Sequence, residues 1–551
     1  MGPASTHVAF RDTHGGKAAR TAAGKSRDMT TTLARTIPPF KNEVVKSFTD
    51  PADAAAMKAA LASVKARFGR HYPLVIDGER IETTKQIRSF NPSRPDEIVG
   101  LTSSASKEQA SAAVEAASRA FATWKRKSAQ ERAAFLFEAA AKVRERRYDY
   151  DALLVYEVGK SWPEADGDIA EAIDFLEFYA REALRYAEPH PVVPIEGERN
   201  EMVYIPLGVG AVIPPWNFAG AIMMGMTSAA IVAGNTVVLK PSSDSAIIAA
   251  WFVDLLHEVG LPKGVVNFIP GSGSEIGDLI VGHPQIRFIS FTGSKEVGLH
   301  INELAAKPQP GQKWIKRVVA EMGGKDSIVV AADANVDAAV EGVAVSAFGF
   351  QGQKCSACSR AIVDASIYDE FVSKLRERVA KIAVGDPEQQ SAYMGPVVNE
   401  AALKSISEYI EVGKKEGRLI AGGKRVGTQG YFLEPTVIAD VDPKARIAQE
   451  EIFGPVLAII KASDFDHAME IANNTEFGLT GSLYTSDEAK IERAKEEFFV
   501  GNLYFNRKST GAYVGVHPFG GFNMSGTDSK AGGRDYLLLF TQAKTMSRKI
   551  S

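Results

Sequence analysis

Short apolar strands alternate with helices between residues 208 and 304, and this alternation limits the chain to few folds. Four segments have the continuous, β-branched composition of buried parallel strands: GVGAVIP (208–214), TVVLKP (236–241), VVNFIPG (265–271) and RFISFTGS (287–294). A helix-forming segment separates the first two strands, and another follows the fourth. Strands that alternate with helices, with glycine where a strand ends, are typical of a doubly wound α/β sheet that binds nucleotides.

A second α/β unit is predicted after residue 320. A chain of 551 residues has room for two or three domains, so we place a boundary near this residue. The predicted elements are the strand DSIVV (326–330), a helix from Asn335 to about Phe350, the strand SRAIVD (359–364) and a helix after Tyr368. Helices are also predicted from Ala105 to about Arg146 and from Asp168 to Arg185, and a long functional loop over Asn502–Thr527.

Charge is absent from Met202 to Leu239, a stretch of 38 residues without Asp, Glu, Lys or Arg. Prolines and polar residues interrupt it, and its longest apolar piece is at the lower limit of what spans a bilayer. We interpret it as buried core and expect no membrane partner. Over the whole chain, 64 Lys and Arg stand against 67 Asp and Glu, so the net charge of −3 gives no reason to expect a nucleic acid partner.

Two cysteines, Cys355 and Cys358, are the only ones in the chain, which excludes a disulfide framework and is typical of a reducing compartment. No other cysteine and no paired histidine spacing completes a zinc site, so we expect no metal. Two interpretations remain for GFQGQKCSACSR (349–360). Both cysteines are small apolar residues at the end of a helix, or one is a nucleophile whose pKa the adjacent Lys354 lowers.

A thiol that attacks a carbonyl group needs an oxyanion donor and, if an acyl-enzyme forms, a base that activates water. Asn217, in the turn after the first strand, carries an amide where ligands approach parallel sheets. The alternative is a turn-forming asparagine. Glu321 follows the apolar strand KRVVA (316–320), where burial would raise its pKa and suit it to general-base chemistry. The alternative is a solvated loop acid.

Phosphate binding is indicated by two glycine-containing segments, GSGSEIG (271–277) and GSKEVG (293–298). Each is a weak signal alone, because either could be an ordinary turn. Both follow apolar strands, which would present bare backbone N–H groups and a positive helix end to a phosphate. Lys240 adds a cation at the end of a third strand.

Eight segments, in this order along the chain, together resemble the aldehyde dehydrogenase family: PWNF, KPSS, FTGSKEVG, EMGGK, GQKCSACSR, GYFLEPTV, EEIFGPV and PFGGF. The resemblance covers the chain from about Asn42 to the C-terminus. The resemblance implies NAD- or NADP-dependent oxidation of an aldehyde to an acid. It also implies an α/β fold with a Rossmann-like cofactor domain, an α/β catalytic domain and a small β arm for oligomerisation.

On this resemblance, we predict a cofactor domain of residues 41–190 and 207–320, a catalytic domain of 321–522, and an arm of 191–206 and 523–551. Residues 1–40 are expected to be a poorly ordered N-terminal extension, and the protein a homo-oligomer, either a dimer or a hexamer. The extension lacks the apolar segment of a secretory signal. We therefore expect a cytoplasmic protein in a bacterium or a matrix protein in a mitochondrion. A transit peptide, or a start at Met29, is the alternative for this segment.

Matched to the family motifs, Cys355 corresponds to the nucleophile, and Glu321 to the base that activates water. The amide of Asn217 and the backbone N–H of Cys355 correspond to the oxyanion donors, whereas Cys358 matches no catalytic position. The residues matched to cofactor contacts are Pro215, Trp216, Lys240, Ser243, Gly271, Gly293, Ser294, Glu451 and Phe453. Ser243 stands where many NAD-preferring members carry glutamate, which leaves NADP open beside NAD.

GFQGQKCSACSR and NRKSTGAYVGVHPFGGF (506–522) resemble the family members that oxidise L-glutamate γ-semialdehyde to L-glutamate in the second step of proline catabolism. The resemblance implies that Lys354, Ser356, Gly511 and Ala512 anchor the α-carboxylate of the substrate, with Glu171 beside it. An ammonium, a hydroxyl and two loop N–H groups suit an anion. Another small semialdehyde is the alternative substrate. Functional coupling to a proline dehydrogenase is expected, although the chain is too short for a fusion with one.

Overall fold

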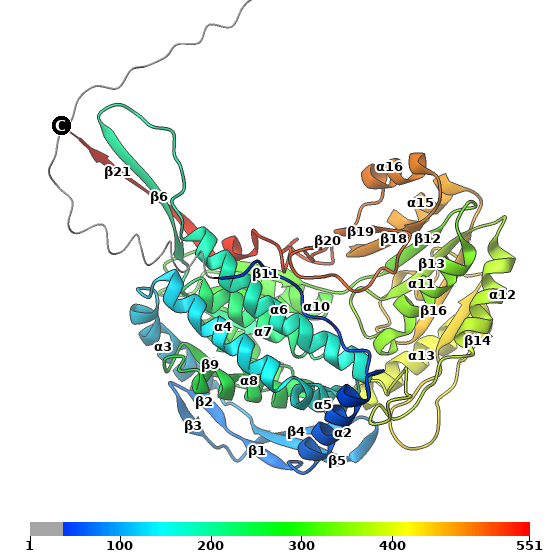
Figure 1. Cartoon of the computed structure of the whole chain (residues 1–551), viewed down its shortest axis with the longest axis horizontal. Helices are drawn as coiled ribbons and strands as arrows, with labels where there is room; N and C mark the ends of the chain where they lie inside the picture. Colours follow the sequence, from blue (N-terminus) through cyan, green and yellow to red (C-terminus); the bar gives the residue numbers. More distant parts are fainter. Residues whose placement is uncertain (1–36, 551) are drawn as a thin grey trace, which may run out of the picture. The chain divides into compact units, whose positions relative to one another are not determined.

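The computed structural model describes residues 37–550. Lys41–Ser551 form one compact unit, which contains two seven-stranded sheets (Figure 1). The predicted N-terminal extension lies, up to residue 36, outside the described residues.

The first sheet has the strand order β11-β10-β7-β8-β9-β2-β3. The strands from β11 to β9 are parallel, and β2 and β3 add an antiparallel edge. The four strands predicted between residues 208 and 294 are β7 to β10, so the predicted parallel sheet is confirmed. Their bounds are β2 Leu74–Ile76, β3 Glu79–Ile81, β7 Val209–Ile213, β8 Thr236–Leu239, β9 Val266–Phe268, β10 Ile286–Thr292 and β11 Arg317–Glu321.

Helices cover both faces of the first sheet. Val238 shares one apolar core with residues of the helices α3 and α10, whereas Val237 and Leu239 alternate to the opposite face, where α7 packs on β7 and β8 and α6 packs on α7. The helices of this half are α2 Pro51–Lys65, α3 Lys107–Trp124, α4 Ala129–Glu145, α5 Arg147–Val158, α6 Trp162–Tyr186, α7 Ala221–Val232, α8 Ala246–Glu258, α9 Asp278–Gly282 and α10 Lys295–Ala306.

The helical region predicted from Ala105 to Arg146 is divided into α3 and α4. Ser128 forms a capping box with Glu131, which starts α4 as a separate helix. The uncharged stretch from Met202 to Leu239 contains α7, which is buried along nearly its whole length. Among residues 37–550, no helix is both long and apolar enough to cross a bilayer.

The second sheet has the order β14-β15-β16-β13-β12-β18-β19, with only β14 antiparallel to its neighbour. Its bounds are β12 Asp326–Val330, β13 Cys358–Asp364, β14 Arg418–Ala421, β15 Thr436–Ala439, β16 Val456–Ala462, β18 Thr480–Tyr484 and β19 Asn502–Phe505. The accompanying helices are α11 Val336–Phe348, α12 Tyr368–Val379, α13 Glu400–Glu416, α14 Arg446–Gln449, α15 Phe465–Asn473 and α16 Glu488–Glu497. The chain leaves the first sheet at Glu321 and enters the second at Asp326, so residues on this short connection lie where the two sheets meet.

Three smaller sheets complete the fold. β1 (Arg70–Tyr72), β5 (Arg94–Ser103) and β4 (Gln86–Asn91) form one; β17 (Phe477–Gly478) and β20 (Phe522–Asn523) form another. β6 (Glu198–Pro206) and β21 (Thr541–Lys549) pair antiparallel and extend away from the two large sheets (Figure 1).

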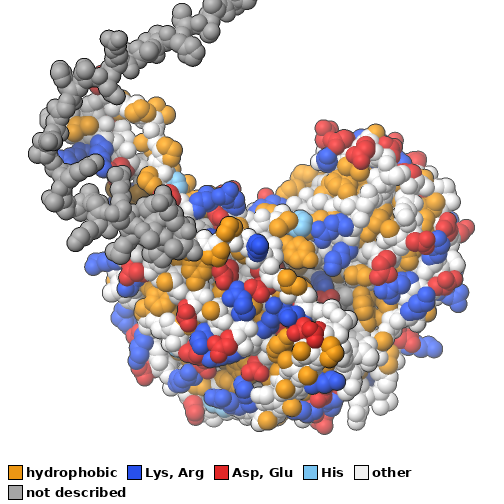
Figure 2. Space-filling model, viewed as in Figure 1, with side chains coloured by type: hydrophobic (Ala, Val, Ile, Leu, Met, Phe, Trp, Pro, Cys, Tyr) orange, Lys and Arg blue, Asp and Glu red, His pale blue; other side chains and the backbone are white. Residues whose placement is uncertain are grey.

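Residues 525–540, which the sequence assigned to the arm, pack beside the first sheet instead. The amide of Met322 donates to Ser525 O at 2.8 Å, and the amide of Gly532 donates to the hydroxyl of Tyr179 at 2.8 Å. The C-terminal segment therefore reaches the end of β11 before it pairs with β6. Across the visible face of the molecule, acidic and basic side chains are interspersed (Figure 2).

Candidate active site

Cys355 lies in a loop whose backbone is held in an unusual conformation. After α11 the chain makes a short 3₁₀ turn, Gly349–Gly352, in which Phe350 and Gln351 have positive φ angles of 48° and 57°. Such angles cost non-glycine residues energy, so the surroundings must hold them. The side chain of Gln351 donates to Gly159 O at 3.0 Å and Pro396 O at 2.8 Å. The turn thereby fixes the backbone four residues before Cys355.

The thiol of Cys355 lines two neighbouring cavities, and no other predicted catalytic residue does so. Burial raises its pKa well above the ordinary value, and the nearby carboxyl groups of Asp326, Glu321 and Glu451 raise it further. Cys358, by contrast, is 1% exposed, and its thiol faces Arg360 O at 3.4 Å. The two cysteines therefore differ in access: only Cys355 faces a cavity large enough for a reactant.

The expectation that Lys354 lowers the pKa of Cys355 is wrong. The ammonium of Lys354 points to Glu164, with Nζ–O distances of 2.7 and 2.8 Å. Lys354 is next to Cys355 in sequence, but its charge is neutralised by this ion pair, and the pKa of the thiol is raised rather than lowered. Lys354 begins a turn, in which the amide of Ala357 donates to Lys354 O at 3.0 Å. Adjacency along the chain therefore did not place the end of its long side chain beside the thiol.

Asn217 is 4% exposed and lies in the turn between β7 and α7. Its amide Nδ2 donates to Gln353 O at 3.1 Å, two residues before Cys355. Gln353 is itself held by the amide of Val398, which donates to its Oε1 at 2.9 Å. The side-chain amide of Asn217 is therefore directed at the loop that carries the thiol.

Glu321, the last residue of β11, lines the second cavity together with Cys355. Ser529 donates its hydroxyl to Oε1 of Glu321, and its backbone N–H reaches the same oxygen at 3.3 Å. Oε2 is buried and has no partner among the described residues. Burial raises the pKa of Glu321 to about 7, so the carboxyl group can exchange a proton near neutral pH.

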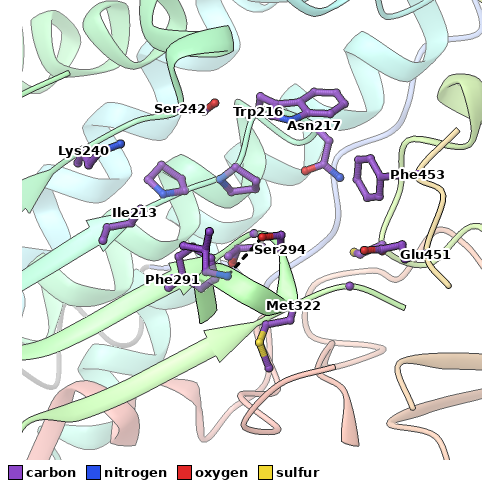
Figure 3. A pocket seen from close by; sticks show the side chains of 17 residues that line it. Ile213, Trp216, Asn217, Lys240, Ser242, Phe291, Ser294, Met322, Glu451 and Phe453 are labelled. Carbon is purple, nitrogen blue, oxygen red and sulfur yellow. Dashed lines mark hydrogen bonds between the residues drawn. The ribbon is translucent and has the colours of Figure 1, made fainter. Parts of the chain in front are cut away.

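The first cavity, of about 380 Å³, opens at the carboxyl ends of β7, β8 and β10 (Figure 3). Seven of the residues matched to cofactor contacts line it: Pro215, Trp216, Lys240, Gly293, Ser294, Glu451 and Phe453. Figure 3 places Lys240 toward one end of the cleft and Phe453 with Glu451 toward the other. The cleft is therefore elongated, and Glu451 at one end is near enough to act electrostatically on Cys355.

Charged and polar groups at both ends of the cleft lack strong partners. The ammonium of Lys240 is buried, which lowers its pKa to about 8, and within residues 37–550 it has one hydrogen bond, to Pro241 O at 3.5 Å. At the other end, burial raises the pKa of Glu451 to about 7, and its Oε1 accepts from the amide of Gly324 at 3.0 Å. A side chain at Gly323 would meet Glu451 Oε2 at 2.1 Å, so it would displace this carboxylate.

Two residues matched to cofactor contacts, Ser243 and Gly271, do not line the cleft. Ser243 is exposed at the start of a 3₁₀ turn, and its neighbour Ser242 faces the cleft instead. Gly271 packs against Ile276, where a side chain would meet the Ile276 Cδ1 at 2.6 Å. The absence of a side chain at Gly271 therefore lets Ile276 pack against the backbone. The helix that begins in the cleft is α10, capped by the side chain of Ser294, which accepts from the amide of Val297.

The second and third cavities, of about 110 and 290 Å³, adjoin on the other side of the thiol. Glu171, Ser356, Gly511 and Ala512 line both of them, and Lys354 lines the third. The structure thus brings together the four residues predicted to anchor a carboxylate and Glu171, which was predicted to lie beside it. Burial raises the pKa of Glu171 to about 8, so at neutral pH this side chain is mostly uncharged.

Sequence reasoning missed several groups that complete the site. Ser529, which holds Glu321, is 208 residues away along the chain, and no local motif marks it. Arg507 donates to the carbonyl oxygens of Thr510 and Gly511 at 3.1 and 3.0 Å, and the loop sequence gave no sign of this contact. Among the described residues, no cluster of histidine, cysteine and acidic side chains could hold a metal ion.

Comparison with known proteins relates this site to a family. The model of the aldehyde dehydrogenase family matches residues 80–546. The 1-pyrroline-5-carboxylate dehydrogenase 2 of Bacillus subtilis (strain 168) is 57% identical over 509 residues, which cover 92% of this chain and 99% of that protein.

Two solved structures are similar along almost the whole chain. A 1-pyrroline-5-carboxylate dehydrogenase from Thermus with bound NAD has a TM-score of 0.92 and 51% identity, over 94% of this chain and 100% of its own. Proline utilization A from Bdellovibrio bacteriovorus has a TM-score of 0.92 and 46% identity, over 93% of this chain and 54% of its own. The predicted resemblance and α/β fold are confirmed, and the chain belongs to the aldehyde dehydrogenase family.

Proposed function

We propose that this chain oxidises L-glutamate γ-semialdehyde to L-glutamate with NAD as the oxidant. The observation that carries the proposal is the position of Cys355, which lines both a nucleotide-sized cleft and a second cavity that Ser356, Gly511 and Ala512 also line. The relatives named 1-pyrroline-5-carboxylate dehydrogenase support the same substrate. A different small semialdehyde is the second candidate, because cavity dimensions alone do not separate chain lengths that differ by one carbon.

The first cleft suits NAD by its donors and acceptors. Lys240, with no acidic partner within residues 37–550, would meet ribose hydroxyls at one end, and the carboxylate of Glu451 would accept from the second ribose at the other. The N-terminus of α10 at Ser294 suits a pyrophosphate, because helix N-termini attract anions. Bound NAD would supply a hydride acceptor beside the thiol.

The cleft also bears on the choice between NAD and NADP. Ser242, rather than an acidic residue, lies near Lys240 in the cleft, and Ser243 is turned away from it. No carboxylate would therefore repel a phosphate on the ribose at this point. We propose that NAD is the main cofactor and that NADP is also accepted.

Cys355 begins the reaction by adding its sulfur to the aldehyde carbon. The thiol must first lose its proton, because only the thiolate is a good nucleophile; ionised Glu321 in the same cavity would accept this proton and release it to solvent. The carbonyl oxygen becomes an oxyanion, which the Asn217 amide and the Cys355 backbone N–H would stabilise. Asn217 can serve because its Nδ2 already points toward this loop and donates there to Gln353 O. Loss of hydride from the thiohemiacetal leaves a thioester on Cys355.

Glu321 would then complete the reaction. Its pKa of about 7 lets it accept a proton from water at neutral pH, and its Oε2 has no protein partner within the described residues. The hydroxide equivalent adds to the thioester carbon, the carbon–sulfur bond breaks, and L-glutamate leaves as the thiol is restored.

A carboxylate on the far end of the substrate would be held by the loop at Gly511. In a trans peptide unit the C=O and N–H groups point in opposite directions. Because Arg507 draws the carbonyls of Thr510 and Gly511 to one side, the N–H groups of Gly511 and Ala512 point to the other. Both residues line the substrate cavities, and Ser356 adds a hydroxyl there.

Assembly and pathway remain part of the proposal. Met546 in β21 and Val193 in the segment before β6 are exposed apolar side chains, which favours use of the paired strands β6 and β21 as an oligomerisation arm in a dimer or hexamer. The similarity to slightly more than half of proline utilization A supports functional coupling to a proline dehydrogenase. Size-exclusion chromatography with light scattering tests the first point.

The decisive assay supplies 1-pyrroline-5-carboxylate, which equilibrates with the open semialdehyde, and follows nicotinamide reduction with NAD and NADP separately. We expect a much higher kcat/KM for the semialdehyde than for propanal. Turnover of propanal without turnover of the semialdehyde, with either cofactor, would overturn the substrate. Cys355→Ala serves as the control, which should bind cofactor but turn over neither aldehyde.

A further inference from the structure

An ion pair buried beside the active site has no role in the reaction described so far. Lys160 Nζ lies 2.8 Å from Asp168 Oδ2, and both side chains are 0% exposed. Taking two charges out of water is costly, and such pairs often add nothing to stability. The burial of this ion pair therefore needs an explanation other than stability.

Lys160 lies between two aromatic rings from separate segments. Its Nζ is 4.2 Å from the centre of the Phe218 ring and 4.6 Å from that of Phe350, distances at which an ammonium is attracted to an aromatic face. Phe218 follows Asn217 directly, and Phe350 is the positive-φ residue five positions before Cys355. One cation thus contacts both the segment that carries the amide and the segment that carries the thiol.

Asp168 and Gly159 attach the same two segments by hydrogen bonds. Oδ1 of Asp168 accepts from the amide of Ala221 at 2.6 Å, at the first residue of α7. The carbonyl of Gly159 accepts from the side chain of Gln351 at 3.0 Å. The chain from Gly159 to Asp168 is therefore bound to the Asn217 turn through Asp168 and to the Cys355 loop through Gly159.

We propose that Lys160 is a positioning residue, which fixes the Asn217 amide relative to the Cys355 thiol by contacting Phe218 and Phe350 together. The inference rests on the proposed roles of Asn217 and Cys355 and adds a residue that touches neither substrate nor cofactor. An oxyanion donor acts only when it is held in place before the reaction, so a small displacement of the Asn217 turn lowers the rate.

The alternative is that Lys160 acts on the reaction through Glu171, in the substrate cavity. Asp168 and Lys160 also act electrostatically on Glu171, which lines that cavity. If Lys160 served only Glu171, its loss would alter the KM of the amino-acid semialdehyde. If Lys160 positions Asn217, loss of Lys160 would slow acylation of Cys355 by any acyl donor. This includes a donor that carries no carboxylate and reacts without NAD.

The test is a double-mutant cycle read by hydrolysis of p-nitrophenyl acetate without cofactor. The neutral variant Lys160→Met/Asp168→Asn removes both charges and keeps an oxygen that can accept from Ala221. We expect it to acylate about tenfold more slowly and Asn217→Ala about a hundredfold more slowly. Added to Asn217→Ala, the neutral pair should cost little more, because the residue through which Lys160 acts is already gone.

A matched control lies on α5 and α6, the two helices that flank Lys160 along the chain. Arg147 and Asp166 form a buried pair with an Nε–Oδ1 distance of 2.6 Å and side chains 7% and 0% exposed, but neither lines the three cavities around Cys355. Arg147→Met/Asp166→Asn should lower the melting temperature and leave the acylation rate of the folded protein near that of the wild type.

The outcomes separate this inference from the proposed function. Equal rate losses from the neutral pair with and without Asn217→Ala would overturn the positioning role, as would an equal loss in the control variant. If the neutral pair does not fold, Phe350→Leu removes one ring under Lys160 while keeping the ion pair, and the same cycle with Asn217→Ala applies. A wild-type protein that hydrolyses the ester but does not oxidise the semialdehyde would contradict the proposed substrate and leave this inference standing.

Discussion

Ser529 donates its hydroxyl to Oε1 of Glu321, and its backbone N–H lies 3.3 Å from the same oxygen. The other oxygen, Oε2, has no partner among the described residues. Lys530 adds a positive charge nearby, whereas burial acts in the opposite direction and holds the pKa at about 7. The Cys355 thiol and the Tyr536 phenol also interact electrostatically with this carboxyl group. Ser529 thus fixes one oxygen of the carboxyl group and leaves the other unpaired within residues 37–550.

Ser529→Ala should raise the pKa of Glu321, because it removes a hydrogen bond that stabilises the carboxylate. Thioester hydrolysis at neutral pH should slow by about tenfold, since hydrogen bonds to charged groups contribute roughly 1.5–3 kcal/mol. The measurement is the pH profile of single-turnover hydrolysis, whose acidic limb should move to higher pH.

Ser525→Ala is the control for this change. Ser525 is buried in the same segment and accepts from the amide of Gly478 at 3.0 Å, without touching Glu321. Its removal should cost about 1–3 kcal/mol of stability and leave the pH profile in place. An unchanged pH profile of hydrolysis in Ser529→Ala would show that the Ser529 hydroxyl does not determine the pKa of Glu321.

In the wild type, hydrolysis of the thioester should increase with pH through about 7. Glu321 must be ionised to accept a proton, and its pKa is raised to about 7 by burial. Below that pH the carboxyl group is protonated and the rate falls; above it the rate levels off. A profile that stays flat from about pH 5 to about pH 9 would contradict the assignment of Glu321 as the base.

Alkylation of Cys355 in the cofactor-free protein should be slow at neutral pH and still increase above pH 9. Burial and three nearby carboxyl groups raise the pKa of this thiol well above its ordinary value, and iodoacetamide reacts with the thiolate. The assay uses Cys358→Ser, which leaves Cys355 as the only thiol. In Cys355→Ser the remaining thiol is 1% exposed and should not react until the protein unfolds. If the alkylation rate instead reached a plateau near neutral pH, a nearby cation would have to lower the pKa of Cys355.

Gly511→Val should weaken use of the semialdehyde far more than use of propanal. Gly511 has φ 77°, which side-chain-bearing residues rarely adopt, so the substitution displaces the N–H groups proposed to hold the carboxylate. We expect kcat/KM for the semialdehyde to fall by about a hundredfold. Gly515, in the same loop and also at φ 77°, lines none of the substrate cavities, so Gly515→Val controls for strain. Equal losses for both aldehydes would argue against a carboxylate anchor.

Much of the fold follows from local sequence. The strands β7 to β10 are uninterrupted apolar runs, and such runs with helices between them have few arrangements available. The division between α3 and α4 depended on the Ser128 capping box, which overrides a continuous helical pattern.

The site was predictable where a motif carries its own geometry, and not where contacts come from distant segments. Asn217 and Glu321 each end or follow a parallel strand, so the sheet edge brings them together. Ser529 reaches Glu321 only because the C-terminal segment folds back along β11, and Lys354 turns to Glu164 across 190 residues. Ser242 and Ser243 lie at the start of a 3₁₀ turn, and the turn determines which of their hydroxyls faces the cleft. The spacing of the motif does not specify this orientation.

The most direct test of the account is to trap the covalent intermediate in Glu321→Gln. With water activation removed and Cys355 intact, the semialdehyde and NAD should yield one equivalent of reduced cofactor and a glutamyl thioester on Cys355, identified by mass spectrometry of the peptide. Adding Cys355→Ala should abolish both the adduct and the reduced cofactor. An adduct on Cys358, or one equivalent of reduced cofactor with no adduct on any cysteine, would contradict the mechanism.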